Sequence, residues 1–194
     1  MKLVHGVGVY EKGVHAGRIG SKQTRPYNLW VNMLKRCYSE VSFTNQPTYT
    51  GCTVSENFKH FQYFAEWCQG QVGFSTGGYQ LDKDLLVKGN KIYSEHTCIF
   101  VPKDLNVLLN KNGAIRGGNP LGVSFDTQSG KYKASIRISG KKKTIGLYSS
   151  PEEAFVGYKH TKEATVQQMV NKWKDQIDPR AYTALMNYQV EITD

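Results

Sequence analysis

The sequence predicts an α+β fold, with a helical N-terminal part and a C-terminal three-stranded antiparallel sheet packed on a helix. Segments 24–38 and 55–69 repeat apolar residues at helical spacing. Segment 131–138 alternates strictly between polar and apolar residues, which is the period of a half-buried strand. Ser150 and Pro151, followed by two glutamates, predict the start of a long helix directly after the sheet.

The N-terminal half begins with a glycine-rich segment, 1–23, which predicts a loop or an extended arm. Two interpretations of this arm stay open: a contact along DNA phosphates, or a loose terminus. The helix Thr24–Tyr38 has a threonine at the capping position and a proline in its first turn. We expect a polar connection over 39–53 and a second helix over Ser55–Gln69, capped by its serine.

A strand is expected within 79–90, a second over Thr97–Val101, and a short helix opening at Pro102. The segment 111–120 contains three glycines and a proline and predicts a linker between domains. The predicted domains are therefore 1–110 and 121–194, on either side of that linker.

The C-terminal domain begins with three predicted strands over 121–148, joined by turns at Gly130 and Gly140. Alternation in the middle strand places cations on the face opposite its apolar side chains. The helix predicted from Ser150 continues to about Trp173. Its expected sheet-facing residues are Ala154, Tyr158, Thr161, Ala164, Thr165 and Met169.

The net charge of +9 is concentrated in two blocks. Residues 1–40 hold seven basic and two acidic residues, and residues 111–150 hold eight basic and one acidic. Two basic blocks indicate two contacts with a phosphate backbone. The alternative is that the charge only keeps a small protein in solution, but a solvated surface rarely gathers cations on one side of a strand.

The remaining composition argues against several protein classes. No apolar run approaches the roughly 20 residues needed to span a bilayer, and the first residues do not resemble a secretory signal. The four cysteines form no CxxC pair, which argues against a zinc ribbon or finger. We therefore expect a cytoplasmic protein with reduced, partly buried cysteines.

Four features in order resemble the AP2 DNA-binding domain: Gly122–Val123, Tyr132, Ile145–Tyr148 and Glu152–Ala154. Tyr132 stands where that family usually has tryptophan. The resemblance implies that the sheet enters the DNA major groove. The DNA-binding residues that it implies are Arg116, Lys131, Lys133, Ser135 and Arg137, with Lys141, Lys142 and Lys143 in the turn contacting phosphates.

The upstream half resembles phage HNH-type homing endonucleases, which often carry an AP2-like module. The similarity runs from Leu81–Asp84 through Asn90 and 97–102 to Asn106. It implies a ββα-metal region in which Asp82 and Asn106 hold Mg²⁺ or another divalent metal at the scissile phosphate.

The general base of such a site is a histidine, and Lys83 occupies its position in this chain. A protonated lysine cannot accept a proton. The candidate catalytic residues are therefore Lys83 itself, Asp84 and His96. The substitution leaves open an active site and a degenerate one.

These observations predict sequence-specific binding of double-stranded DNA with metal-dependent cleavage, as in a homing endonuclease of a phage or mobile element. The alternative is a catalytically inactive relative that acts as a DNA-binding transcriptional regulator. A third option is an RNA-binding or protein-interaction module. We expect a monomer on DNA, associated with the nucleoid of a bacterial host, with no membrane contact and no small-molecule cofactor.

Overall fold

The computed structural model describes residues 3–109, 118–138 and 140–193, and the chain divides into two compact units. Unit 1 is Met1–Val101 and unit 2 is Pro102–Asp194. Both contain helices and small sheets, so the predicted α+β class is confirmed at that level. Most of the predicted linker, up to residue 117, lies outside the described residues. The division itself falls earlier in the chain, between Val101 and Pro102.

Unit 1 begins its helical part with α1 (Arg25–Tyr38), as predicted, and α1 buries Trp30 and Leu34 completely. The polar connection expected next is wrong, because it contains α2 (Glu40–Asn45) and the short 3₁₀ helix η1 (Pro47–Tyr49). A local signal was present: the acidic side chain of Glu40 lies in the first turn of α2, where it complements the helix dipole.

The second predicted helix is divided at His60 into α3 (Glu56–Lys59) and α4 (Phe61–Gln69). His60 is extended there, with φ −88° and ψ 118°. The N-terminal arm causes the break: Val9 donates its N–H to the carbonyl of Lys59 (2.8 Å) and accepts from the N–H of Phe61 (3.0 Å). These bonds replace the helical pattern across one residue, so helical periodicity alone could not predict the interruption.

An aromatic cluster forms the core of unit 1. Trp30 and Phe58 are fully buried, and the Trp30 indole donates to the Phe58 carbonyl at 2.8 Å. Phe61 and Phe64 add edge and tilted ring contacts, and Phe100 extends the cluster toward the strands. Trp30, Phe58, Phe61 and Phe64 are therefore core residues, as their spacing predicts, whereas Tyr63 is exposed.

The glycine-rich arm is attached to this core. The Gln62 amide donates to the carbonyls of Glu11 (3.1 Å) and His15 (2.9 Å), and its oxygen accepts from the His15 N–H (3.0 Å). Farther along, β1 (Arg18–Ile19) and β2 (Lys22–Gln23) form a small antiparallel hairpin. The described part of the arm is thus not a loose terminus.

Two small sheets complete unit 1. In one, β3 (Thr53–Val54) runs parallel to β5 (Ile92–Tyr93), a pairing that the sequence did not suggest. In the other, β4 (Tyr79–Asp82) pairs with β6 (Ile99–Pro102), close to the two predicted strands. The chain then continues directly into α5 (Lys103–Leu109), the first helix of unit 2.

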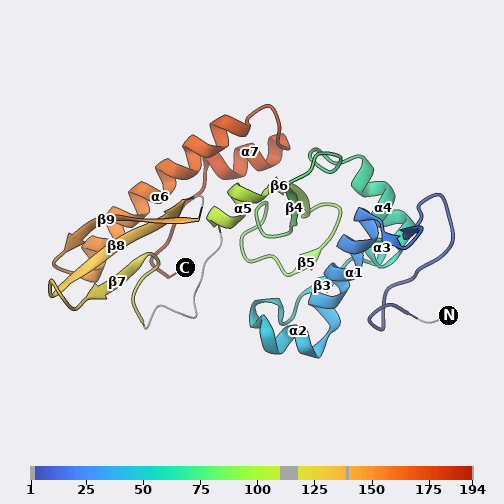
Figure 1. Cartoon of the computed structure of the whole chain (residues 1–194), viewed down its shortest axis with the longest axis horizontal. Coiled ribbons are helices and arrows are strands. Elements are labelled where there is room, and N and C mark those ends of the chain that lie inside the picture. The colour runs from blue at the N-terminus through green and yellow to red at the C-terminus, as the bar shows by residue number, and fades with distance from the viewer. Residues whose placement is uncertain (1–2, 110–117, 139, 194) are drawn as a thin grey trace. The chain divides into compact units, whose positions relative to one another are not determined.

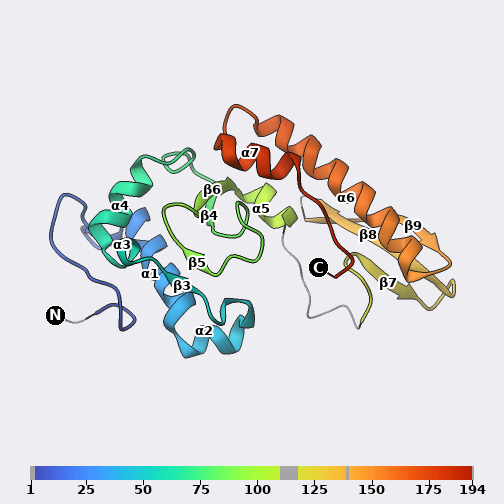
Figure 2. The ribbon, with the colours of Figure 1, turned by 180° about the vertical axis from the view of Figure 1, so that it is seen from behind.

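Unit 2 contains the predicted three-stranded antiparallel sheet, in the order β7 (Val123–Asp126), β8 (Lys131–Ile138) and β9 (Lys141–Tyr148). The helix α6 (Pro151–Trp173) lies along one face of it, and both views show the helix following the strands (Figures 1 and 2). The helix α7 (Pro179–Met186) packs beside α6.

The start of α6 is as predicted, since Ser150 Oγ accepts the N–H of Glu153 at 3.2 Å. Of the residues expected to face the sheet, Ala154 and Tyr158 are buried, and those farther along the helix are not. The buried residues there are Lys162, Val166 and Val170, in place of Thr161, Ala164, Thr165 and Met169. The reason is that α6 also packs against α5 and α7, so its buried stripe follows those helices beyond the sheet.

The cysteines Cys37, Cys52, Cys68 and Cys98 are buried and free, as expected for reduced thiols. In the described ranges no helix combines the length and the apolar character that a membrane crossing requires.

Candidate nucleic-acid interface

The β7-β8-β9 sheet has one face covered by α6 and one open face. Ala134 and Ile136 lie on the covered face and are almost completely buried. Their neighbours Ser135 and Arg137 therefore lie on the open face. Register pairs Ser135 with Thr144 and Arg137 with Lys142. Thr144 was not among the predicted DNA-binding residues, because a bulge between Ala134 and Ser135 shifts the pairing of β9.

Arg137 and Lys142 form a directly opposed pair of like charges on neighbouring strands. Both residues are exposed, and within the described part of the chain no carboxylate pairs with either of them. Like charges in this position destabilise a sheet. A bound polyanion would remove that repulsion, so the pair favours an anionic ligand on this face.

Lys133 lies on the predicted face, but Asp126 of β7 already neutralises its charge. Their ion pair measures 2.6 Å, with about a third of the Lys133 side chain exposed. The hydrogen bond from Lys133, followed by one from Ser129, holds the pKa of Asp126 below its ordinary value. Lys133 must therefore leave Asp126 before it can contact a phosphate with its full charge.

The predicted position of Lys141, Lys142 and Lys143 in a turn is wrong, because all three begin β9. The turn before them contains Gly140, whose φ of +80° suits glycine. Register places Lys142 on the open face, while Lys141 and Lys143 lie opposite Ile138 and Ile136 on the other side. All three are exposed, so the three cations point to two different sides of the strand.

Two further predicted DNA-binding residues complete this set. Lys131 begins β8 opposite Asp126 and is exposed. Arg116 lies outside the described residues.

The end of β4 carries the carboxylate Asp82 that the HNH resemblance implies as a metal ligand. Its Oδ1 accepts the backbone N–H groups of Asp84 and Leu85, both at 2.8 Å, so it caps its own turn. Burial raises the pKa of Asp82 above its ordinary value, against the lowering effect of those two N–H donors. Asn90 also stabilises this loop, by donating to the carbonyls of Lys83 (2.8 Å) and Ile92 (2.7 Å).

Lys83 is buried, with 5% of its surface exposed, and its ammonium group forms an ion pair with Asp84. It also donates to the carbonyl of Asn90 at 2.9 Å and lies 5.7 Å from the centre of the Tyr93 ring. An ammonium group held in this way has no lone pair to accept a proton. These contacts therefore assign Lys83 a role in stabilising the loop. Because Asp84 is the partner in the ion pair, its carboxylate serves the same role.

The other two candidate residues lie on other elements. His96 is exposed in the loop between β5 and β6. Asn106 lies on α5, in unit 2, whereas Asp82 belongs to unit 1. No group of three or more His, Cys, Asp or Glu side chains among the described residues is arranged to hold a metal ion. Asp82 Oδ1 already accepts two backbone N–H groups, and the positive charge of Lys83 acts on the same carboxylate, so a divalent cation there would compete with both.

No family model, curated protein or solved structure matches this chain. The two family resemblances therefore depend on the residues that carry them and remain hypotheses.

Proposed function

We propose that this chain binds double-stranded DNA through the open face of the β7-β8-β9 sheet. The observation that carries the proposal is the opposed Arg137–Lys142 pair on the exposed side of a helix-backed sheet. A ribbon of this width fits the major groove of B-DNA. The major groove of double-stranded RNA is too narrow for side chains to read, so the same surface favours DNA.

The two cations have separable roles in this proposal. Arg137 lies in the middle of the sheet's three strands, where its planar guanidinium can donate two bonds to a guanine edge. Lys142 lies on the edge strand β9 and contacts a phosphate as a point charge. Ser135 and Thr144 add hydroxyl donors on the same face.

The experiment selects a preferred duplex from a random pool and measures its affinity by fluorescence anisotropy. Arg137→Gln should cost about 1–3 kcal/mol on the selected duplex and much less on an unrelated one. Lys142→Gln should weaken both duplexes alike and lower the salt dependence by about one counterion. The control is Lys172→Gln, which changes an exposed lysine of α6. Equal binding by all four proteins would sink the proposal.

A second candidate function is cleavage of the bound DNA. The observation that favours it is the pairing of β4 with β6, followed in the chain by α5, which is the strand and helix order of a ββα-metal region. Residues that would hold a divalent ion are Asp82 and Asn106. The competing candidate is a DNA-binding regulator without hydrolytic activity, which the Lys83–Asp84 ion pair favours.

Incubating the selected duplex with Mg²⁺ or Mn²⁺ separates these two candidates. A nuclease should produce defined fragments, and Asp82→Asn or Asn106→Ala should abolish them while leaving DNA affinity unchanged. His96→Ala tests the remaining candidate base in the same assay. If the duplex stays intact at protein concentrations that saturate binding, the nuclease candidate fails and the DNA-binding regulator is the function that stands.

A further inference from the structure

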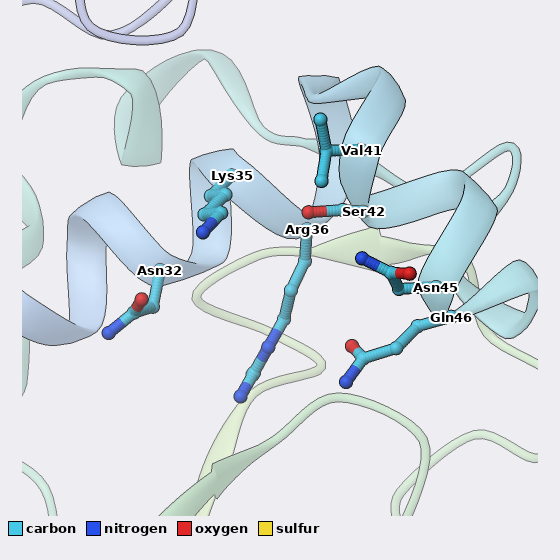
Figure 3. Close-up of a pocket in the computed structure, with 7 residues that line it drawn as sticks. All are labelled: Asn32, Lys35, Arg36, Val41, Ser42, Asn45 and Gln46. Carbon is cyan, nitrogen blue, oxygen red and sulfur yellow. The ribbon is translucent and has the colours of Figure 1, made fainter.

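A polar hollow of about 280 Å³ lies between α1 and α2 of unit 1 (Figure 3). Its two cations belong to the first basic block of the sequence, far along the chain from the sheet. Its lining residues come from the end of α1 and from α2 through Gln46: Asn32, Lys35, Arg36, Val41, Ser42, Asn45 and Gln46.

Arg36 supplies the anchoring charge of this hollow. Its guanidinium lies 5.4 Å from the centre of the Tyr49 ring, and against the lowering effect of burial the neighbouring Tyr93 helps to raise the pKa of Arg36 above its ordinary value. A guanidinium has five N–H donors, and stacking on an aromatic ring fixes its plane while leaving several donors directed elsewhere. No carboxylate in the described ranges pairs with Arg36, so its positive charge is not neutralised.

The rest of the lining adds a second cation and neutral donors. Lys35 is exposed on the adjacent position of α1, and it too has no acidic partner among the described side chains. Asn45 and Gln46 extend toward Arg36 from the α2 side in Figure 3. Glu40, the nearest acidic residue in the sequence, is not part of the lining.

This composition differs from that of an ordinary charged surface. Another arginine of the same block, Arg25, donates to the carbonyls of Thr76 (3.0 Å) and Tyr79 (3.1 Å), so it serves the fold. Arg36 and Lys35 instead both line a concave site with amide and hydroxyl donors. Arginine, lysine, amide and hydroxyl groups are the side chains that proteins place on phosphate oxygens.

We propose that the hollow between α1 and α2 binds a backbone phosphodiester of the nucleic acid that the protein holds. This inference rests on the proposed DNA-binding function and adds a second contact, in the other unit. Such a contact positions the nucleic acid without reading its sequence.

The first test uses a phosphodiester probe alone. Dimethyl phosphate is titrated into the full-length, ¹⁵N-labelled protein, with sodium chloride at equal ionic strength as the reference. Backbone amides of Ser42, Asn45 and Gln46 should shift saturably, and the double variant Lys35→Gln/Asn45→Ala, which keeps Arg36, should need a clearly higher probe concentration to saturate. Both changed residues are exposed, so this variant should fold, which circular dichroism checks.

The second test measures duplex affinity against salt for the same double variant. We expect affinity to fall by about threefold to tenfold on every sequence and the salt dependence to decrease by about one counterion. The matched control is Lys88→Gln, an exposed lysine of unit 1 outside both the hollow and the N-terminal arm. Wild-type affinity and salt dependence in the double variant would overturn the proposal, even if dimethyl phosphate binds.

The two proposals fail in different ways. If Arg137→Gln and Lys142→Gln weaken binding but the double variant does not, the hollow is not a DNA contact and the sheet still is. If only the double variant weakens binding, the sheet proposal fails and the hollow stands. A protein that binds no duplex at all overturns both.

Discussion

At the scale of single residues, two buried lysines in different surroundings decide much of the local electrostatics. Lys83 has the carboxylate of Asp84 as its partner. Lys162 has 4% of its surface exposed, donates to the Leu108 carbonyl and lies 6.0 Å from the centre of the Tyr158 ring. No acidic group among the described residues pairs with it, and burial lowers its pKa from 10.5 to about 8. Folding therefore disfavours its charge.

The low pKa of Lys162 predicts a pH dependence of stability. Between pH 8 and 10.5 the unfolded state carries a proton on Lys162 that the folded state has lost, so the contribution of Lys162 to the free energy of unfolding should rise with pH. Burial raises the pKa of the Cys37, Cys68 and Cys98 thiols, which acts in the opposite direction, so the effect of Lys162 is the difference between wild type and a variant without it. Above pH 10.5 the Lys162 contribution should approach about 3 kcal/mol, which corresponds to the difference between its two pKa values. Below pH 8 it should be absent, because Lys162 is protonated in both states.

Urea denaturation across this pH range measures the effect. Lys162→Met removes the titrating group and should flatten the rise relative to wild type, whereas Lys172→Met, on an exposed position of the same helix, should keep it. Parallel curves for all three proteins would contradict the assigned pKa.

The Arg137–Lys142 pair makes a second prediction at this scale, in the protein without DNA. Removing one of two opposed like charges should stabilise the sheet by roughly 0.2–1 kcal/mol. Arg137→Gln should therefore raise the free energy of unfolding while it lowers DNA affinity. A loss of stability in denaturation experiments would show that Arg137 makes a favourable contact within the fold.

At the scale of elements, the packing of the sheet on α6 depends on one close approach. Gly122, just before β7, has φ +78°, and a Cβ there would lie 2.1 Å from the Tyr158 ring. Gly130, in the turn between β7 and β8, has φ +67° with nothing near its Cβ position. The two glycines therefore share backbone strain but differ in crowding.

Alanine substitutions at Gly122 and Gly130 separate the cost of backbone strain from the cost of crowding against Tyr158. Gly130→Ala should cost about 1–2 kcal/mol from the left-handed backbone alone. Gly122→Ala should cost about 1–3 kcal/mol more, because Tyr158 must shift in a packed interface. Thermal and chemical denaturation of the two variants gives the comparison, and equal losses would show that Tyr158 moves away freely.

At the scale of the whole molecule, each unit has its own core: the Trp30–Phe58 aromatic cluster in unit 1, and the sheet with α6 in unit 2. We expect two separable unfolding transitions in calorimetry. Gly122→Ala should lower the temperature of one transition and leave the other unchanged. A single transition that shifts as a whole would indicate that the two cores unfold together.

Elements with local signals could be predicted from the sequence alone. Alternation over 131–138 marked β8, the Ser150 cap marked α6, and helical spacing marked α1, because each depends on neighbours within a few residues. The open face of the sheet followed from the same alternation. The period of the strand was therefore enough to assign Ser135 and Arg137 to that face.

Features that depend on partners distant in the chain were settled only by tertiary contacts. Pairing with Val9 interrupts the helix at His60, and a bulge brings Thr144 onto the open face. Asp126 forms an ion pair with Lys133, and Asp84 forms one with Lys83. Periodicity assigns a side chain to a face but carries no information about which group meets it there. The partners that neutralise or orient a charge are fixed only when the chain folds.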